Sequence, residues 1–386
     1  MTPTDPVLLK FEIPEIIYGL GALSQIGQCA KRLGGERVMV VTDPGVIDAG
    51  WVDECAKFLD RADVKFIVYD NVVTNPRCYQ VAEGATLYRE KQCDVIVAVG
   101  GGSPIDVAKG VAVLVSNHGM IHDYVGCNLV TQPIPPLICM PTTAGTGSDV
   151  SQFAIIADPR EKIKMTILSR AIMADISLID PRLLQTKSDE LMAATGIDAL
   201  THAIEAFVSS ISWPLTDPHA FHAIELVFQH LRTAVATRNI PALEGMAVAS
   251  LEAGIAFSNA ILGAVHALAH PLGGVYDIHH GLANAILLPV VVRRNLEHAP
   301  KKFAEIANAM GLDTRGISME NVAEEVPRMI EQLICDINLP NTLSAVGVRS
   351  ADIPALARDA HRDLCMETNP HHYTVAEIES MYRESL

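Results

Sequence analysis

The chain has 386 residues, of which 49% are hydrophobic, and 29 Lys and Arg against 45 Asp and Glu give it a formal net charge of −16. This length exceeds the roughly 250 to 300 residues that one hydrophobic core usually supports, so two domains are expected. With no basic block to offset it, the negative charge argues against nucleic acid and anionic membrane surfaces as partners.

Three features bear on the cellular compartment. The eight cysteines lie far apart with no C-x-x-C motif, which is typical of reduced intracellular thiols. The start, "MTPTDPVLLKFEIP", has early prolines and no basic stretch before an apolar run, so we expect no signal peptide. The 24 uncharged residues between Glu252 and Asp277 include histidines, Asn259 and a proline, which favours buried interior over a membrane span. A cytoplasmic protein is therefore expected.

The first half of the chain alternates strand-like and helix-like segments. Three apolar, β-branched runs end in turn residues, as strands buried on both faces do: 37–43, 64–70 and 93–102. Between them, two segments have helical spacing: 50–61 and 78–91. This βαβ pattern predicts a parallel sheet with helices on both faces. Two more apolar runs extend this half, and the second could supply late strands or a hairpin: 136–150 and 164–180.

The composition changes after about Leu184. From there the segments are long, rich in Ala, Leu, Glu and Met, and separated by short Pro, Gly or Asn breaks, with no convincing strand. We therefore predict an α/β domain over residues 1–184 and an all-helical domain over residues 185–386.

Two loops rich in small residues indicate a nucleotide site. "AVGGGSPIDVAKG" follows a predicted strand and opens a helix, whose N-terminus and glycines could receive a pyrophosphate. It lacks the G-x-G-x-x-G pattern, and a purely steric turn explains it equally well. "PTTAGTGSD" also follows an apolar run and offers hydroxyls, with a helix N-cap as the alternative. Two such loops together favour a nucleotide at the C-terminal edge of the sheet.

Asp43 ends the first of these strand-like runs. A carboxylate at this place can accept hydrogen bonds from the ribose of NAD and repel the additional phosphate of NADP. It can equally cap the turn that begins at Pro44. The sequence favours neither interpretation.

Histidines and carboxylates gather in the second half. In "TGIDALTHAIEAF", Asp198, His202 and Glu205 stand at i, i+4 and i+7, which places them on one face of a helix. This spacing lets neighbouring turns hold one metal ion, while a simple surface pair is the alternative.

A second histidine cluster strengthens the metal interpretation. In "AVHALAHPLGGVYDIHHG", His266 and His270 are again i and i+4, and Pro271 with the glycines after it is expected to end that helix. His279 and His280 then follow in a loop. Buried imidazoles need hydrogen bonds or a metal. Nitrogen and oxygen ligands suit Zn²⁺ or Fe²⁺ better than Ca²⁺ or Mg²⁺, but spacing alone does not select among these residues.

As a set, these motifs resemble the iron-containing, or group III, alcohol dehydrogenase family. The resemblance runs nearly end to end, through "YGLGAL", "VVTD", "TNP", "GGGSPIDVAK", "PTTAGTGSDV", "ATGIDALTHAIEAF", "HALAHPLGGVYDIHHGLANAILLP" and "CMETNP". It implies a Rossmann-like nucleotide-binding domain followed by an all-helical metal-binding domain, the architecture of dehydroquinate synthase.

The resemblance also implies roles for individual residues. The metal ligands of the family fall on Asp198, His202, His266 and His280. The histidine beside the nicotinamide falls on His270, the expected catalytic residue, and Glu205 and His279 are left with supporting or structural roles. The cofactor contacts fall on Asp43, Asn75, Gly101, Gly102, Ser103, Asp106, Thr142, Thr143, Thr146 and Lys164. The substrate pocket would be lined by Phe153, Phe257 and Cys365.

The implied reaction is metal-polarised hydride transfer between NAD(H) and a small primary alcohol or diol and its aldehyde, with Fe²⁺ as first choice and Zn²⁺ or Mn²⁺ as alternatives. Other possibilities are polyol oxidation as in glycerol dehydrogenases, a lyase of the dehydroquinate synthase type, or a catalytically silent binding protein. A reductase for a functionalised short aldehyde such as lactaldehyde, sulfoacetaldehyde or succinic semialdehyde also stays open. Ile105 stands where many relatives carry a polar residue, which leaves the substrate open. A homodimer or larger homo-oligomer is implied.

Overall fold

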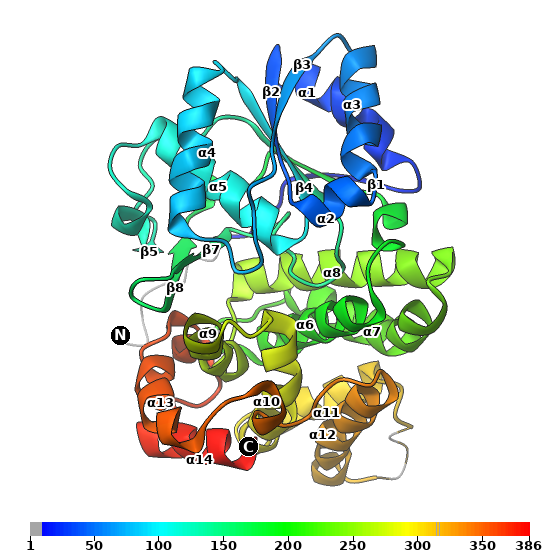
Figure 1. Cartoon of the computed structure of the whole chain (residues 1–386). Helices are drawn as coiled ribbons and strands as arrows, with labels where there is room; N and C mark the ends of the chain where they lie inside the picture. Colours follow the sequence, from blue (N-terminus) through cyan, green and yellow to red (C-terminus); the bar gives the residue numbers. More distant parts are fainter. Residues whose placement is uncertain (1–9, 314, 316) are drawn as a thin grey trace.

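The computed structural model describes residues 10–313, 315 and 317–386, and in it an α/β half lies against an all-helical half (Figure 1). Residues 1–9, on which the expectation of no signal peptide partly rests, lie outside the described residues. The predicted order of an α/β half followed by an all-helical half is confirmed.

The α/β half is built on a six-stranded sheet in the order β1-β9-β6-β4-β2-β3, and every neighbouring pair is parallel. Its strands are β1 (Glu15–Tyr18), β2 (Arg37–Val41), β3 (Lys65–Tyr69), β4 (Val95–Gly100), β6 (Leu137–Pro141) and β9 (Ile176–Ile179). Each of the apolar runs predicted as a strand contributes one of them. Every residue of β4 is buried, as expected for a central parallel strand.

Alternate residues of the sheet enter two separate cores, one on each face. Val38 and Val40 pack with α1 and α3, whereas Met39 and Val41 pack with α4 and α5. The helices of this half are α1 (Ile26–Arg32), α2 (Pro44–Asp48), α3 (Trp51–Arg61), α4 (Cys78–Glu90) and α5 (Gly102–Ser116). The two predicted helices are therefore confirmed as α3 and α4.

A second, smaller sheet lies beside the cleft between the two halves. It consists of β5 (Gly126–Cys127), β7 (Phe153–Asp158) and β8 (Ile163–Leu168). The strands β7 and β8 form an antiparallel hairpin, with Phe153 opposite Leu168. The sequence indicated late strands in 164–180 but not the partner strand, because its pattern is less regular.

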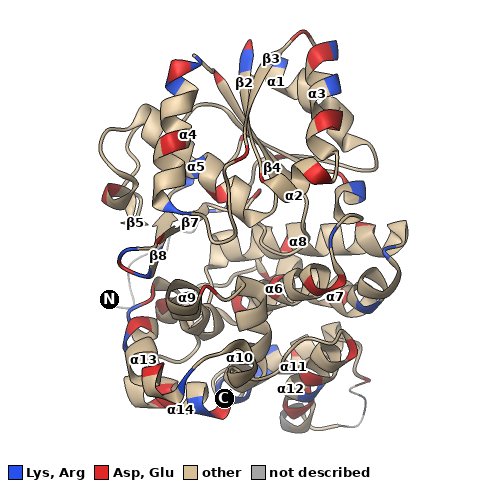
Figure 2. Ribbon diagram, viewed as in Figure 1, with Lys and Arg blue, Asp and Glu red and all other residues tan. Residues whose placement is uncertain are grey.

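The second half contains helices throughout its described residues. They are α6 (Asp189–Val208), α7 (Asp217–Thr237), α8 (Ile240–Ala260), α9 (Ala264–Tyr276), α10 (His280–Asn295), α11 (Pro300–Ala309), α12 (Met319–Asp336), α13 (Ile353–His361) and α14 (Val375–Glu384). The last strand ends at Ile179 and the first long helix begins at Asp189, while the predicted boundary at residue 184 stays a prediction. Charged residues lie mainly on outer helices such as α3, α4 and α12 (Figure 2).

Two helices, α6 and α8, are long and apolar enough to cross a bilayer by length and composition alone. However, 94% of the most apolar window of α6 is buried inside the molecule, where the helix packs against α7, α8 and α10. For α8 the buried share is 61%. The uncharged stretch after Glu252 likewise packs as protein interior, as the sequence indicated.

The expected end of α9 at Pro271 is wrong, because the helix continues through this proline to Tyr276. Packing against the rest of the helical half holds α9 in helical form beyond Pro271, because most of its residues up to Gly273 are buried. In addition, Oη of Tyr382 in α14 donates a hydrogen bond to the carbonyl of Leu268 in α9 at 2.6 Å. The glycines after Pro271 do not end the helix but allow another segment of the chain to lie close to it. A Cβ on Gly273 would lie 2.4 Å from Cε of Lys164 in β8.

Replacing Tyr382 by Phe should lower the free energy of unfolding by about 1 kcal/mol, because a buried hydrogen bond between α14 and α9 is lost. Urea denaturation measures the change. Tyr79→Phe is the control, since the Tyr79 side chain is exposed. Equal stabilities for the two variants would contradict the role given to the Tyr382 bond.

Candidate active site

A cleft of about 710 Å³ separates the C-terminal edge of the large sheet from the helical half. Its lining includes every predicted site residue except Thr142: the other nine cofactor positions, the four candidate metal ligands, His270 and the three pocket residues. Thr142 is fully buried, and its hydroxyl has no hydrogen-bond partner among the described residues. The fold thus gathers residues from Asp43 to Cys365 around one space.

The first glycine loop presents the N-terminus of α5 to the cleft. Gly101 is the N-cap and provides no side-chain bond, so the first backbone N–H groups of α5 lack a side-chain cap. A Cβ on Gly101 would lie 3.1 Å from Oγ1 of Thr143, and one on Gly102 would lie 3.0 Å from Cγ2 of Thr146. The two small-residue loops therefore pack on each other and leave a helix N-terminus suited to an anion.

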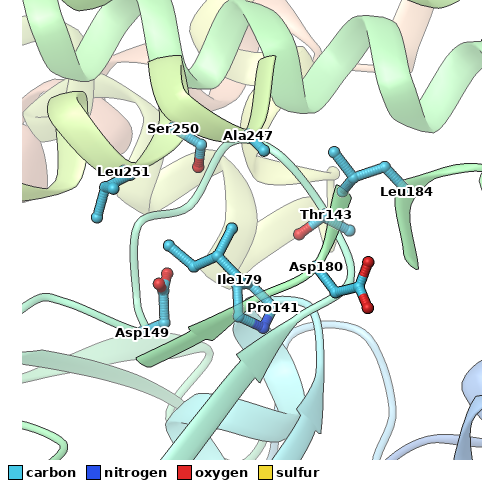
Figure 3. Close-up of a pocket in the computed structure, with 9 residues that line it drawn as sticks. All are labelled: Pro141, Thr143, Asp149, Ile179, Asp180, Leu184, Ala247, Ser250 and Leu251. Atoms are coloured by element: carbon cyan, nitrogen blue, oxygen red, sulfur yellow. The ribbon is translucent and has the colours of Figure 1, made fainter. Parts of the chain in front are cut away.

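The second loop, 141–149, connects the cofactor side of the cleft to the helical half. Asp149 in this loop accepts a hydrogen bond from Ser177 at 2.6 Å. A small cavity of about 10 Å³ lies beside the loop, lined by Asp149, Thr143 and Ser250 among others (Figure 3). Gly145 lies so close to α6 that a Cβ would be 2.4 Å from the carbonyl oxygen of Thr195. This close approach requires glycine.

The structure confirms that Asp43 is a helix cap, while its contact with the ribose of NAD stays a prediction. Its carboxylate caps α2, accepting a hydrogen bond from the backbone N–H of Val46 at 3.0 Å, and the residue also lines the cleft. One carboxylate oxygen is used in the cap, which leaves the other for a ligand.

Asn75 is held by the opposite half of the molecule. Its Nδ2 donates to Oδ1 of Asp277 at 2.7 Å, and Arg77 pairs with Oδ2 of the same carboxylate at 2.9 Å. Both Asn75 and Asp277 have positive φ angles, 53° and 57°. Asp277 ends α9 only three residues before His280, so it ties the predicted cofactor loop to the start of α10. The expectation that His280 lies in a loop is wrong, because His279 is the N-cap of α10 and His280 its first residue.

Two charged groups, buried Asp106 and half-buried Lys164, line the part of the cleft predicted to bind the cofactor. Burial raises the pKa of Asp106 to about 6, and its Oδ1 has no partner among the described residues. Burial lowers the pKa of Lys164 to about 8, although Asp198 and Asp106 nearby act in the opposite direction. An unpartnered buried acceptor and a partly desolvated cation fit the hydroxyl and amide groups of a dinucleotide.

Asp198, His202, His266 and His280 form a compact cluster at the floor of the cleft. One ligand atom from each lies within 4.8 Å of the others, and Oδ1 of Asp198 is 3.8 to 4.0 Å from Nε2 of each histidine. The first two come from α6, and the others from α9 and α10. Burial holds the pKa of His266 and His280 well below 6.5, so their lone pairs are available.

The cluster is oriented by hydrogen bonds from behind. Nδ1 of His202 donates to the carbonyl of Gly145 at 3.0 Å, and Nδ1 of His266 donates to Oε2 of Glu205 at 2.5 Å. Both bonds direct Nε2 towards the cluster, as is usual for metal-binding histidines. Glu205 thus holds His266 through this hydrogen bond, and burial raises its pKa to about 7.

The sequence interpretation missed Asn284 and Asp363. Nδ2 of Asn284 donates to Oδ1 of Asp198 at 2.7 Å and lies 3.2 and 3.3 Å from Nε2 of His266 and His280. Asn284 stands four residues after His280 on α10, so the i, i+4 rule already applied to the histidine pairs could have found it. Asp363 accepts a hydrogen bond from Nδ1 of His270, which lies 93 residues earlier in the chain. Local spacing in the sequence cannot predict a contact between residues so far apart.

The chemistry of these residues fits a divalent cation and a nicotinamide dinucleotide. One carboxylate and three imidazoles suit Fe²⁺ or Zn²⁺. The open N-terminus of α5 suits a pyrophosphate, and the unpartnered Oδ1 of Asp106 suits a donor on the ligand. Such a cleft defines a metal-dependent oxidoreductase linked to a nicotinamide cofactor.

Comparison with known proteins supports this class of enzyme. A model of the family "Iron-containing alcohol dehydrogenase" matches residues 14–181, and one of "Fe-containing alcohol dehydrogenase family, C-terminal" matches residues 192–386. The chain is 42% identical over 382 residues to 1,3-propanediol dehydrogenase of Citrobacter freundii, covering 98% of this chain and 99% of that protein. It is 36% identical to the NAD-dependent methanol dehydrogenase of Bacillus methanolicus, with 97% and 98% covered.

Among solved structures, a 1,3-propanediol oxidoreductase superposes with a TM-score of 0.96 at 40% identity, covering 98% of this chain and 100% of the other. The chain therefore belongs to the iron-containing alcohol dehydrogenase family, as its motifs predicted. Members of this family interconvert alcohols and aldehydes with NAD(H) and a divalent metal.

The metal-free protein should lose stability as the pH falls from about 6.5 to 5.5. His280 stays neutral in the folded state, where its pKa is depressed, but protonates in the unfolded chain, so the unfolded state binds more protons. His280 contributes up to about 1.4 kcal/mol per pH unit to this loss. Urea unfolding of chelator-treated protein should give a shallower slope for His280→Gln, but not for the exposed His372→Gln. Equal slopes for the unmodified protein and the two variants would show that His280 does not cause the loss of stability.

Proposed function

We propose that this enzyme oxidises a small primary alcohol or diol to its aldehyde, reversibly and with NAD(H). The observation that carries the proposal is the convergence of the α5 N-terminus, the Asp and His cluster and His270 on one cleft. Beside the cluster the wall is apolar: the rings of Phe153 and Phe257 lie 5.8 Å apart, and Phe257 stacks on His202 at 4.4 Å. An apolar wall beside the cluster favours the apolar part of a substrate and excludes water.

Asp198, His202, His266 and His280 would hold the metal, with Fe²⁺ as first choice and Zn²⁺ or Mn²⁺ as alternatives. When bound, a divalent cation at this position supplies Lewis-acid polarisation of the substrate oxygen. The α5 N-terminus, Asp106 and Lys164 bind and orient the cofactor, while His270 takes up the proton of the substrate hydroxyl. Phe153, Phe257 and Cys365 shape the substrate end of the cleft.

Neutral substrates are favoured over anionic ones by the charges around the cleft. Lys164 and Lys187 are the cationic residues among its described lining, and each has carboxylates nearby, including Asp198 and Asp43 respectively. These carboxylates weaken the attraction of both lysines for the carboxylate or sulfonate of an anionic substrate. Glycerol-like polyols and lactaldehyde are alternatives, and succinic semialdehyde and sulfoacetaldehyde are less well matched. A cytoplasmic homodimer or larger homo-oligomer completes the proposal.

The direct test follows NADH absorbance with a panel of short alcohols, diols and aldehydes, neutral and anionic, at equal Fe²⁺ or Zn²⁺ loading. Neutral short substrates should give the higher kcat/KM. A preference for the anionic aldehydes would refute the substrate proposal, and no turnover with any pair would refute the dehydrogenase assignment.

Asp43 should set the preference for NADH over NADPH. Removing its charge is expected to tighten NADPH binding by about tenfold, since repulsion of the additional phosphate disappears. Asp43→Asn is the sharper variant, because Asn can keep the cap on Val46 while Asp43→Gly also loses it. Fluorescence titration gives both dissociation constants. If NADPH already binds the unmodified protein as tightly as NADH, Asp43 does not have this role.

His266 and His270 stand one helical turn apart but should behave differently. His266→Ala should release the metal, because a ligand is lost. His270→Ala should retain it and lower kcat by about 10² to 10⁴-fold, the range of a general base. Metal content by elemental analysis and kcat on the same preparations separate the roles. Equal metal loss from the two variants would overturn the division.

A further inference from the structure

His270 is held from behind by a residue of the C-terminal region. Its Nδ1 donates to Oδ2 of Asp363 at 2.7 Å, while Oδ1 of Asp363 accepts from the backbone N–H of Cys365 at 2.9 Å. The His270 ring also stacks on His280, with centroids 5.5 Å apart and planes 15° apart. The hydrogen bond and the stacking together define the position and the plane of the imidazole.

Asp363 itself is rigidly placed. It is the N-cap of a short 3-10 helix, η7 (Leu364–Thr368). Oγ1 of Thr368 donates to the carbonyl of Leu262, and Oδ1 of Asn369 accepts from the N–H of Ala264 at 3.1 Å. Both bonds attach η7 to the start of α9, the helix that carries His270. The carboxylate and the imidazole therefore belong to one packed unit.

The bond to Asp363 decides which nitrogen of His270 carries the proton. An ionised carboxylate only accepts hydrogen bonds, so Nδ1 is protonated and the lone pair is on Nε2. Within the described residues Nε2 has no hydrogen-bond partner, and His270 lines the cleft. The free lone pair is thus available to a molecule in the cleft.

We propose that Asp363 is a positioning residue for the dehydrogenase reaction, which holds His270 in the tautomer whose Nε2 can accept the hydroxyl proton of the alcohol. This inference rests on the role proposed above for His270. In the oxidation, the O–H bond of the alcohol breaks and its proton joins Nε2, while the C–H electron pair leaves as hydride for NAD⁺. The products are aldehyde, NADH and a doubly protonated His270 whose Nδ1–H still bonds Asp363.

Asp363→Asn is the informative variant because it separates the cap from the tautomer. The N–H of Cys365 needs an acceptor, so the amide oxygen of Asn is expected to face it and the NH₂ group to face His270. An NH₂ donor requires the lone pair on Nδ1, which moves the imidazole proton to Nε2. Asp363→Ser keeps a cap for Cys365 but leaves Nδ1 without its partner. Asp359→Asn, an exposed carboxylate on α13, is the control for charge.

The experiment measures kcat, KM, the NADH dissociation constant and metal content for these variants, alone and combined with His270→Asn. Asp363→Asn should lower kcat by about 10² to 10⁴-fold, with metal content and NADH binding as in the control. Asp363→Ser should lose less. In the His270→Asn background, Asp363→Asn should cause no further loss, because the residue acts through His270.

A direct readout is the nitrogen-15 chemical shift of His270, assigned by its absence in His270→Asn. The native metal-free protein should show a protonated Nδ1, and Asp363→Asn a protonated Nε2. The proposal is overturned by an unchanged tautomer, by a kcat equal to that of Asp359→Asn, or by losses that add to those of His270→Asn. If His270→Asn itself leaves kcat unchanged, the role of His270 fails, while the nitrogen shifts still decide whether Asp363 sets the tautomer.

Discussion

The desolvation of one carboxylate and three imidazoles in a single pocket is the constraint on which the rest of the structure depends. Groups of this kind are costly to bury unless each polar atom is paired or bound to a metal. The fold meets the cost from behind the cluster: Gly145 and Glu205 accept from His202 and His266, and Asn284 donates to Asp198. The Nε2 atoms of His202 and His266 are thereby directed into the cluster, whereas Nδ1 of His280 has no hydrogen-bond partner among the described residues.

The two halves of the molecule are connected by hydrogen bonds around this cluster. Gly145, which orients His202, belongs to the same loop as Thr143 and Thr146 at the cofactor side of the cleft. The carboxylate of Asp277 ties Asn75 to the turn just before His280. The domain boundary in the chain is not a boundary in the active site.

Several glycines, and Pro271, have structural roles in this protein that local sequence rules do not predict. The glycines after Pro271 resemble a helix end, yet they let Lys164 and the β7–β8 hairpin approach α9. Gly145 likewise permits the loop to reach α6. In each case a small residue is needed because another segment passes close by, and that neighbour is distant in sequence. Its identity depends on the packing of the whole chain.

The sequence by itself determined the parallel strands, the two small-residue loops and the histidines that share a helix face, because these depend on periodicities of two or about four residues. Family resemblance then separated His266 from His270, which spacing left equal. Only the tertiary structure decided that Thr142 is buried away from the cleft and that α9 continues through Pro271. The partner Asp363 emerged in the same way, because its hydrogen bond to His270 joins segments distant along the chain and leaves no trace in local spacing. Asn284, four residues after His280, did have a local signal, but its hydrogen bond to Asp198 is again a contact between distant segments.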